Sequence, residues 1–189
     1  MTAKDRVDRD DVGMIVVFAG RRPGSDAFPD ENVSIVKQRI HQAVAELRPR
    51  LAIGSAAAGA DLLTACAALA AGARVEILLA GGKERFQSES VDDKGPSWSE
   101  QFNRLLCSDA VSVTEVLRVD DADVAYRAVT AAIVERAEQL AEEQETIALL
   151  AMSSPRDEGV DHTEEMVALA RQRGWRVLRI DTARENEPD

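Results

Sequence analysis

Residues 51–61 constrain the fold of this chain more than any other stretch. A short apolar run ends at Gly54, small residues lead to Gly59, and an Ala- and Leu-rich segment begins at Asp61. This pattern predicts a strand, a tight glycine turn and a helix. Glycine lets the backbone approach a ligand closely, and the first turn of a helix presents unpaired N–H groups that suit an anion. Taken alone, the motif is equally typical of a close-packed turn without a ligand.

Further strands are predicted by apolar runs elsewhere in the chain. These runs are residues 14–19, 75–79, 111–117, 146–152 and 175–180. The alternation in residues 111–117 is imperfect, whereas the first run is apolar at every position and rich in β-branched residues. Continuous apolarity is typical of a strand buried on both faces, as in a parallel sheet covered by helices.

Helical periodicity separates these strands. Helices are predicted over residues 30–47, 61–71, 122–143 and 161–174, with a further apolar stripe that starts at Trp98. Strands that alternate with helices predict an α/β fold with right-handed parallel crossovers. Residues 81–97 are polar and contain several Gly and Ser residues, which predicts a long loop that could cover a crevice at the sheet edge.

The composition limits the class of protein. A chain of 189 residues with 45% hydrophobic content suits one sizeable domain. We expect a flexible leader at residues 1–12, a single domain over 13–181 and a flexible tail at 182–189. No apolar run approaches the roughly 20 residues that span a bilayer, and the charged start of the chain lacks a signal-peptide pattern. The expected location is therefore the cytoplasm, without a membrane partner.

Charge and cysteine content exclude other classes. The net charge of −11 argues against binding to nucleic acid, because phosphate neutralisation dominates that binding. It still allows a small anion in a local basic pocket. Cys66 and Cys107 lie far apart in helical patterns, so we expect buried free thiols and no metal site.

Two arginines follow the first predicted strand. Gly20, Arg21 and Arg22 come directly after its apolar run. Ligands of open α/β sheets bind at the carboxyl ends of the strands, so these cations are candidates for an anion site. The alternative is that they are solvated surface cations.

The glycine turn and the arginine segment together resemble motifs of the SLOG superfamily of nucleotide-binding domains. The segment Gly20-Arg21-Arg22-Pro23 is similar to that superfamily's first-strand Gly-His-Arg or Gly-Ser-Arg signature, with Arg21 in place of His or Ser. Residues 54–61 are similar to its Gly-x-Ala-x-Gly-x-Asp turn. The resemblance implies a three-layer Rossmann-like fold, with a mostly parallel sheet flanked by helices on both faces.

A third motif of the superfamily is degraded. Its phosphoribohydrolases, which activate cytokinins, share a Pro-Gly-Gly-x-Gly-Thr-x-x-Glu segment that binds phosphate and carries the catalytic glutamate. Here the stretch from Pro155 to Thr163 lacks the paired glycines, and Met166 stands at the glutamate position. Glu164 and Glu165 are displaced, and each residue turns a helix by roughly 100°. No catalytic residue is therefore transferred to this chain.

The first hypothesis for function is a nucleotide-binding sensor or regulatory domain without catalysis or cofactor. SLOG-like domains of this kind are associated with bacterial stress or defence. Asp61 would accept from a ribose hydroxyl or a base, or would cap its own helix. The expected ligand-contacting residues are Gly20, Arg21, Arg22, Gly54, Ser55, Gly59, Asp61, Ser153, Gly159 and Thr163.

Two other hypotheses remain open at the level of sequence. One is an enzyme that cleaves the N-glycosidic bond of a nucleotide with Asp161, Glu164 or Glu165 near His162. Acidic residues at a helix start are also common because of the helix dipole alone. The other is a scaffold protein whose ligand site has decayed. Related domains often pair as homodimers, but no feature of the sequence decides the oligomeric state.

Overall fold

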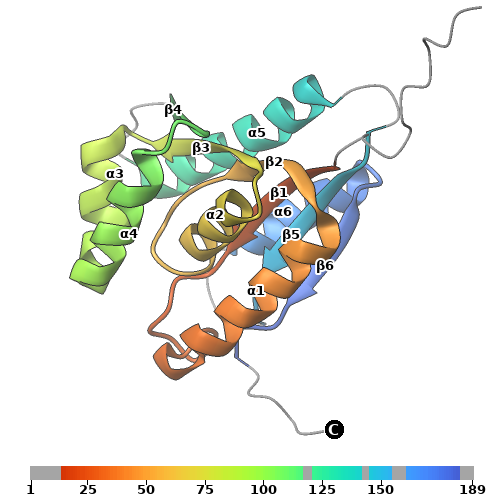
Figure 1. The fold of residues 1–189 in the computed structure, drawn as a ribbon. Coiled ribbons are helices and arrows are strands. Elements are labelled where there is room, and N and C mark those ends of the chain that lie inside the picture. Colours follow the sequence, from red (N-terminus) through yellow and green to blue (C-terminus); the bar gives the residue numbers. More distant parts are fainter. Residues whose placement is uncertain (1–13, 117–120, 142–144, 155–160, 184–189) are drawn as a thin grey trace, which may run out of the picture.

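The computed structural model of the protein describes residues 14–116, 121–141, 145–154 and 161–183. Its centre is a six-stranded sheet in the order β4-β3-β2-β1-β5-β6, and each neighbouring pair is parallel (Figure 1). The strands are β1 (Met14–Gly20), β2 (Pro49–Gly54), β3 (Arg74–Ala80), β4 (Val111–Val116), β5 (Ile147–Met152) and β6 (Arg176–Ile180). The parallel sheet predicted from the apolar runs is confirmed.

The order of the strands reverses at β1. From β1 the chain passes outward to β2, β3 and β4, and then returns to the other side of β1 to form β5 and β6. Ligands of open parallel sheets bind outside the carboxyl ends of the strands at such a point of reversal. The carboxyl ends of β1 and β5 are therefore the expected place for a site.

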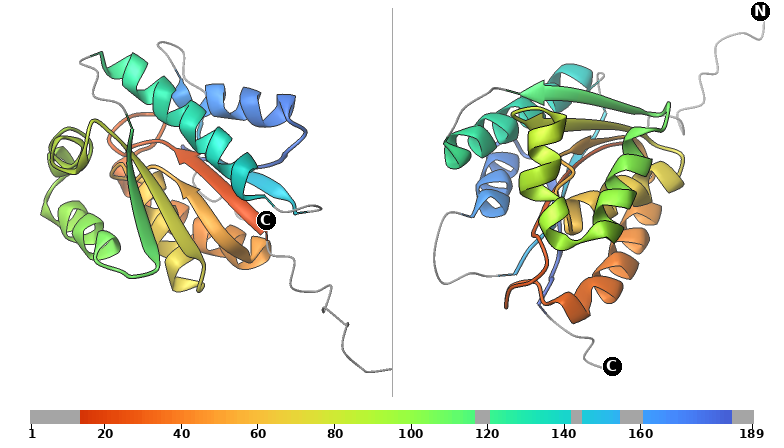
Figure 2. Two further views of the ribbon diagram at one scale, coloured as in Figure 1. Left: turned by 90° about the horizontal axis from the view of Figure 1, so that it is seen from above. Right: turned by 90° about the vertical axis from the view of Figure 1, so that its left-hand side faces the viewer.

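Helices cover both faces of the sheet, as Figure 2 shows. One face carries α1 (Val33–Leu47), which follows a short 3-10 turn, and α2 (Ala60–Ala70), with α4 (Pro96–Leu106) beside α2. The other face carries α5 (Ala122–Leu140) and α6 (His162–Gln172). The three-layer, Rossmann-like α/β fold class expected from the sequence is thus confirmed.

Successive side chains of β1 face opposite layers. Val16 and Phe18 belong to the apolar cluster under α1 and α2, whereas Ile15 and Val17 belong to the cluster under α5 and α6. All four side chains are buried. Burial on both faces explains why this segment reads as a continuous apolar run instead of an alternating pattern.

Residues 81–97 form two helical segments instead of the predicted long loop. They are α3 (Lys83–Ser90) and the 3-10 helix η3 (Asp92–Lys94). Phe86 is buried, and its ring stacks on that of Phe102 in α4 with 6.1 Å between the ring centroids. A helix of two turns that buries so few apolar side chains lacks the periodicity from which a helix is predicted.

The folded part of the chain continues past residue 181, where the sequence predicts the start of a tail. Thr182 is fully buried, and its hydroxyl donates to the carbonyl of Ala27 in the loop after β1. The backbone N–H of Ala183 donates to the Ser154 hydroxyl at 2.8 Å. These contacts hold the residues after β6 against the loop after β1 and against the segment after β5.

Other sequence predictions differ in detail or fall outside the described residues. Cys66 is half-buried and Cys107 is exposed, whereas the sequence predicts that both thiols are buried. Helix α5 ends at Leu140, three residues before the predicted limit, and residues 142–144 are not among those described. The predicted leader at residues 1–12 and most of the predicted tail also lie outside the described ranges.

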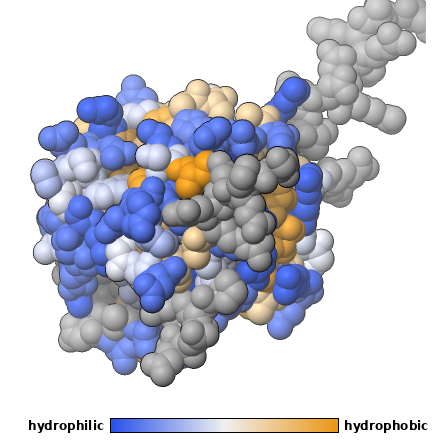
Figure 3. Space-filling view, turned by 90° about the horizontal axis from the view of Figure 1, so that it is seen from below, coloured by the Kyte–Doolittle hydropathy of each residue, from blue (hydrophilic) through white to orange (hydrophobic). Residues whose placement is uncertain are grey.

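The surface is predominantly polar. The face shown in Figure 3 is mostly hydrophilic, and its hydrophobic residues gather in a few small areas. Among the described residues, no helix combines the length and apolarity needed to cross a membrane. The large apolar side chains are instead concentrated between the sheet and its two helical layers.

The start of α2 lies against the loop that follows β1. Gly59 has a φ of 114°, and a Cβ atom at this position would lie 2.7 Å from the Arg21 carbonyl oxygen and 2.7 Å from Pro23 Cδ. The backbone N–H of Ala60 donates to that same carbonyl at 3.0 Å. Gly59 therefore has a packing role, because a side chain here would push α2 and the β1 loop apart.

We expect Gly59→Ala to destabilise the protein more than Gly72→Ala. Both glycines have a positive φ, but a Cβ at Gly72 meets nothing within 4 Å. Gly72→Ala therefore serves as the control, because it includes the strain of a side chain at positive φ but not the steric clash. Crowding typically costs about 1–3 kcal/mol, so the free energy of unfolding should fall by about that much more in Gly59→Ala. Urea denaturation measures it, and equal losses in the two variants would contradict the close-packing role.

Candidate functional site

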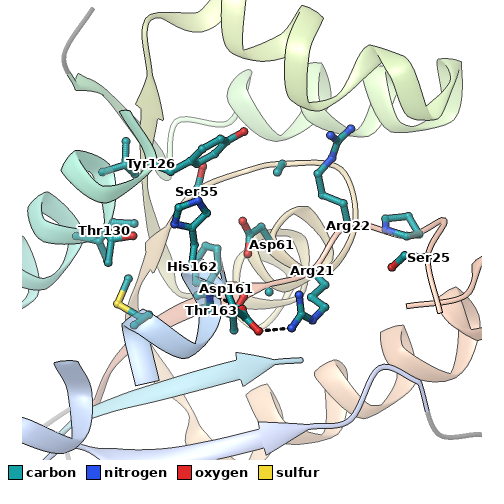
Figure 4. Close-up of a pocket in the computed structure, with 18 of the residues that line it drawn as sticks. Arg21, Arg22, Ser25, Ser55, Asp61, Tyr126, Thr130, Asp161, His162 and Thr163 are labelled. Atoms are coloured by element: carbon teal, nitrogen blue, oxygen red, sulfur yellow. Dashed lines mark hydrogen bonds and ion pairs between the residues drawn. The ribbon is translucent and has the colours of Figure 1, made fainter. Parts of the chain in front are cut away.

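A cavity of about 420 Å³ opens at the carboxyl ends of the central strands. The loop after β1 and the turn before α2 form one side, and the start of α6 and the middle of α5 form the other (Figure 4). Lys94 of η3 also lines it. The position agrees with the reversal of strand order at β1, where parallel sheets bind ligands.

Asp61 is the most unusual polar residue of this cavity. It lies in the first turn of α2, is 9% exposed, and lines the cavity. Its buried Oδ1 atom accepts no hydrogen bond from any residue that the structure describes. No side chain caps the start of α2, so the cap role considered for Asp61 is not the one observed. In Figure 4 the carboxyl lies between the labelled side chains of His162 and Arg22.

Burial raises the pKa of the Asp61 carboxyl from 3.8 to about 7. Removal from water disfavours the charged form of a carboxyl group. A hydrogen bond with the Gly20 backbone favours the charged form and offsets part of this effect. Near neutral pH the Asp61 side chain is therefore divided between its acid and carboxylate forms.

Arg21 is buried and fully engaged with the protein. Its Nε and Nη2 atoms donate to the Ser154 carbonyl at 3.1 and 2.9 Å, and Nη2 also pairs with Asp161 (Figure 4). The Asp161 carboxylate also caps α6, because it accepts from the backbone N–H groups of Thr163 and Glu164 at 3.1 and 3.2 Å. Arg21 thus links the ends of β1 and β5 to the start of α6, and Asp161 balances its charge.

Arg22 and Lys94 supply the accessible positive charge of the cavity. Arg22 forms an ion pair with Asp93, its side chain is 32% exposed, and its buried Nε has no partner among the described residues. Lys94 is half-buried, and its side chain makes no hydrogen bond or ion pair within the described part of the chain. A local basic area therefore exists in a protein whose net charge is −11.

The wall opposite these cations is apolar and aromatic. Buried side chains of β1, α5 and α6 form it, namely Phe18, Val129, Ile133 and Met166. The rings of Tyr126 and His162 lie above this wall with 5.3 Å between their centroids. The Tyr126 hydroxyl shares a hydrogen bond with Ser90 of α3 at 3.0 Å. The cavity is therefore polar at one end and apolar at the other.

The structure brings together six of the ten residues expected to contact a ligand. Those that line the cavity are Gly20, Arg21, Arg22, Ser55, Asp61 and Thr163. Gly54, Gly59 and Ser153 do not line it, and Gly159 lies outside the described residues. A Cβ at Gly54 would lie 2.4 Å from the Phe18 ring, so this glycine also permits close packing.

Three amide groups of the glycine turn are already engaged within the protein. The Ala58 N–H donates to the Ser90 carbonyl at 2.9 Å, and the Ala60 N–H donates to Arg21 at 3.0 Å. The Leu62 N–H donates to Ala57 at 3.2 Å. Side chains of the cavity are therefore better placed than these amides to hold an anion.

The acidic residues considered for catalysis are mostly engaged elsewhere. Glu164 accepts from Arg179 at 2.7 and 2.5 Å and from Ser153 at 3.0 Å, and the bonds from Arg179 lower its pKa. Glu165 contacts His162 at 3.2 Å. Neither glutamate lines the cavity, whereas Asp161 and His162 do.

Some lining residues are not predicted by the sequence. Lys94 lies in the stretch predicted to be a loop, and Ser25 lies in the loop after β1. Tyr126 and Thr130 lie on α5. Tyr126 is the single tyrosine of the chain, and its hydroxyl is the signal that could have indicated a polar lining.

Comparison with known sequences gives no relative. No protein-family model matches the chain, and no curated protein matches it. The class of the protein is therefore inferred from the motifs in its sequence and from its fold.

Comparison with solved structures finds proteins with a similar fold. The molybdenum cofactor carrier protein of Chlamydomonas reinhardtii is 16% identical, with a TM-score of 0.37 over 90% of this chain and 92% of that one. DNA processing protein A of Streptococcus pneumoniae is 13% identical, with a TM-score of 0.38 over 90% and 59%. The molybdenum cofactor binding protein of the phototrophic bacterium Rippkaea orientalis is 13% identical, with a TM-score of 0.33 over 87% and 88%.

These similarities concern the fold. At these identities and TM-scores the similarities carry no argument about the ligand of this chain.

We expect Asp61 to make the protein less stable as the pH rises. In the unfolded chain this carboxyl ionises near its ordinary pKa of 3.8, whereas in the folded protein it holds its proton up to about pH 7. The folded state binds more protons in this interval, so the free energy of unfolding falls as the pH rises through it and then levels off. At about 1.4 kcal/mol per pKa unit, the full loss is on the order of 4 kcal/mol.

The measurement compares urea denaturation of the wild type and Asp61→Asn between about pH 4 and pH 8. Asparagine cannot ionise, so the variant should gain stability over the wild type as the pH rises. Asp109→Asn, which removes an exposed carboxylate, serves as the control. A constant difference between the wild type and Asp61→Asn across the pH range would show that Asp61 has an ordinary pKa.

Proposed function

We propose that the protein binds a nucleotide or a nucleotide-derived small molecule in the cavity at the carboxyl ends of β1 and β5, and that it acts as a sensor or regulatory module. The observation that carries this proposal is the pairing of two unsatisfied atoms in one cavity. Among the described residues, the buried side-chain atoms without a hydrogen-bond partner are Arg22 Nε and Asp61 Oδ1. Both residues line the same space.

Unsatisfied buried polar atoms are uncommon because each costs about 1–3 kcal/mol. A close-packed turn without a ligand has no reason to retain a donor and an acceptor of this kind beside a cavity. A ligand that offers polar groups to both residues would remove the cost. This is why we favour a binding site over a decayed one.

The distribution of charge and apolar surface suits the parts of a nucleotide. Arg22 and Lys94 would hold a phosphate by charge-assisted hydrogen bonds. The apolar wall would accept a flat ring, next to the aromatic pair of Tyr126 and His162. Asp61 would lie beside the polar groups of the ligand that connect its phosphate to its ring. The net charge of −11 supports a small ligand over a nucleic acid.

Binding without catalysis is supported by the state of the carboxylates. Asp161 is committed to Arg21 and to capping α6. Glu164 and Glu165 do not line the cavity. Glycosidic cleavage generally uses two carboxyl groups that flank the bond. Among the described residues that line the cavity, the other carboxylate besides Asp61 is Asp161, which is already committed.

The ligand can be sought directly. Mass spectrometry of small molecules released from the heat-denatured protein should detect a stoichiometric nucleotide or nucleotide derivative. Thermal-shift screening of mono-, di- and cyclic nucleotides should find a stabilisation that grows with concentration, as mass action requires. Recovery of a free base and a ribose phosphate after incubation would instead support the enzyme hypothesis. No bound species and no thermal shift would support the scaffold hypothesis.

We expect Lys94→Ala to weaken the binding of adenosine monophosphate about 10- to 150-fold, because a charged hydrogen bond contributes about 1.5–3 kcal/mol. Isothermal titration calorimetry provides the dissociation constant. Lys37→Ala is the matched control, since Lys37 is exposed on α1 and does not line the cavity. Equal effects of the two substitutions would place the phosphate outside this cavity.

A further inference from the structure

The surroundings of Asp61 determine more than the position of a ligand. Its carboxyl group shares the cavity with the two cations that would attract an anion. Neither Arg22 nor Lys94, nor any other cation among the described residues, forms an ion pair with Asp61. The charge of an ionised Asp61 would therefore be uncompensated within the described part of the chain.

We propose that Asp61 carries a proton whenever the cavity holds its anionic ligand, so that binding above neutral pH takes up one proton from the solvent. This proposal rests on the function proposed above and specifies how the same site selects its ligand. It makes Asp61 a hydrogen-bond donor to the ligand, not a fixed negative charge.

Electrostatic repulsion is the physical reason. A phosphate and an ionised carboxylate in one partly buried cavity repel each other, and low dielectric surroundings strengthen this repulsion. The neutral acid avoids it. Burial already favours the acid form of Asp61 in the free protein, so a modest further shift on binding is sufficient.

Other ionisable groups face the same cavity, and most of them have a partner within the protein. They are Arg21 and Arg22 after β1, Lys94 in η3, Tyr126 in α5, and Asp161 and His162 at the start of α6. Arg21 and Asp161 balance each other, and Arg22 has Asp93. The His162 ring is charged only when protonated and lies 3.2 Å from Glu165. The ligand's own charge also changes with pH.

The proton on Asp61 restricts the chemistry of the ligand. A carboxylic acid donates one hydrogen bond, and its other oxygen accepts. The ligand should therefore carry an anionic group toward Arg22 and Lys94, and an acceptor atom such as a carbonyl oxygen or a ring nitrogen toward Asp61. A compound that offers only cationic groups toward Asp61 would not fit this cavity.

The test compares the wild type with Asp61→Asn from about pH 6 to about pH 8.5, with adenosine monophosphate as the probe. Asparagine keeps a donor and an acceptor but cannot become an anion. The ionisation of the free phosphate is common to both measurements, so the ratio of the two dissociation constants reports the contribution of Asp61. Asp109→Asn controls for the loss of one negative charge, because Asp109 lies just before the amino-terminal end of β4, whereas the cavity lies at the carboxyl ends of the strands.

We expect similar affinities of the wild type and Asp61→Asn at the acidic limit. At the basic limit the wild type should bind about tenfold more weakly than Asp61→Asn, because it must first regain a proton. Calorimetry in two buffers with different ionisation enthalpies should show close to one more proton taken up by the wild type than by the variant near pH 8. Asp109→Asn should follow the wild type.

Two outcomes overturn the proposal, and they can be told apart. If adenosine monophosphate binds but the wild type and Asp61→Asn have parallel pH profiles, or if the wild type becomes the tighter binder as the pH rises, the proton on Asp61 is refuted while nucleotide binding stands. If neither protein binds the probe at any pH, although both are folded by circular dichroism, nucleotide monophosphate binding falls together with this inference.

Discussion

The contact between the β1 loop and the start of α2 is the constraint on which the site depends. The Arg21 carbonyl accepts from the Ala60 N–H at 3.0 Å, and Gly59 leaves room for this approach. The backbone of Arg21 thereby meets α2, while its guanidinium holds Ser154 and Asp161. One residue thus connects segments after β1, β2 and β5, and the cavity lies between them. Changes at this junction would alter the shape of the cavity as well as the stability of the fold.

The fold was predictable from the sequence because its signals are local. The continuous apolar run of residues 14–19 and the periodic helices determine a buried parallel sheet without knowledge of any long-range contact. Helix α3 was missed because its burial depends on Phe86 stacking against Phe102, a partner in the next helix. The sequence predicts a tail from Thr182 onward because these residues are polar. Thr182 is nevertheless buried, since the distant Ala27 carbonyl accepts its hydrogen bond.

The site was only partly predictable, and the reason is chemical. The sequence indicates which residues follow a strand, but it does not show which charges will be balanced by other residues. Arg21 and Arg22 look equivalent in sequence, yet Arg21 is buried on Asp161, whereas Arg22 is partly exposed and pairs with Asp93. Similarly, the glycines at 54 and 59 suggested contact with a ligand, whereas they permit contact between parts of the protein itself. Asp61 lines the cavity, and its raised pKa follows from tertiary burial, which no local pattern predicts.

The central position of β1 has a consequence for how the protein forms during synthesis. β1 lies between β2 and β5, so it has one neighbour from early in the chain and another from much later. A ribosome delivers the chain from its amino-terminal end. The half-sheet of β1 to β4 can therefore assemble while one edge of β1 is still open, and β5 must close that edge. Until β5 and α6 emerge, the nascent chain lacks the part of the cavity wall that α6 forms and the partners of the Arg21 side chain.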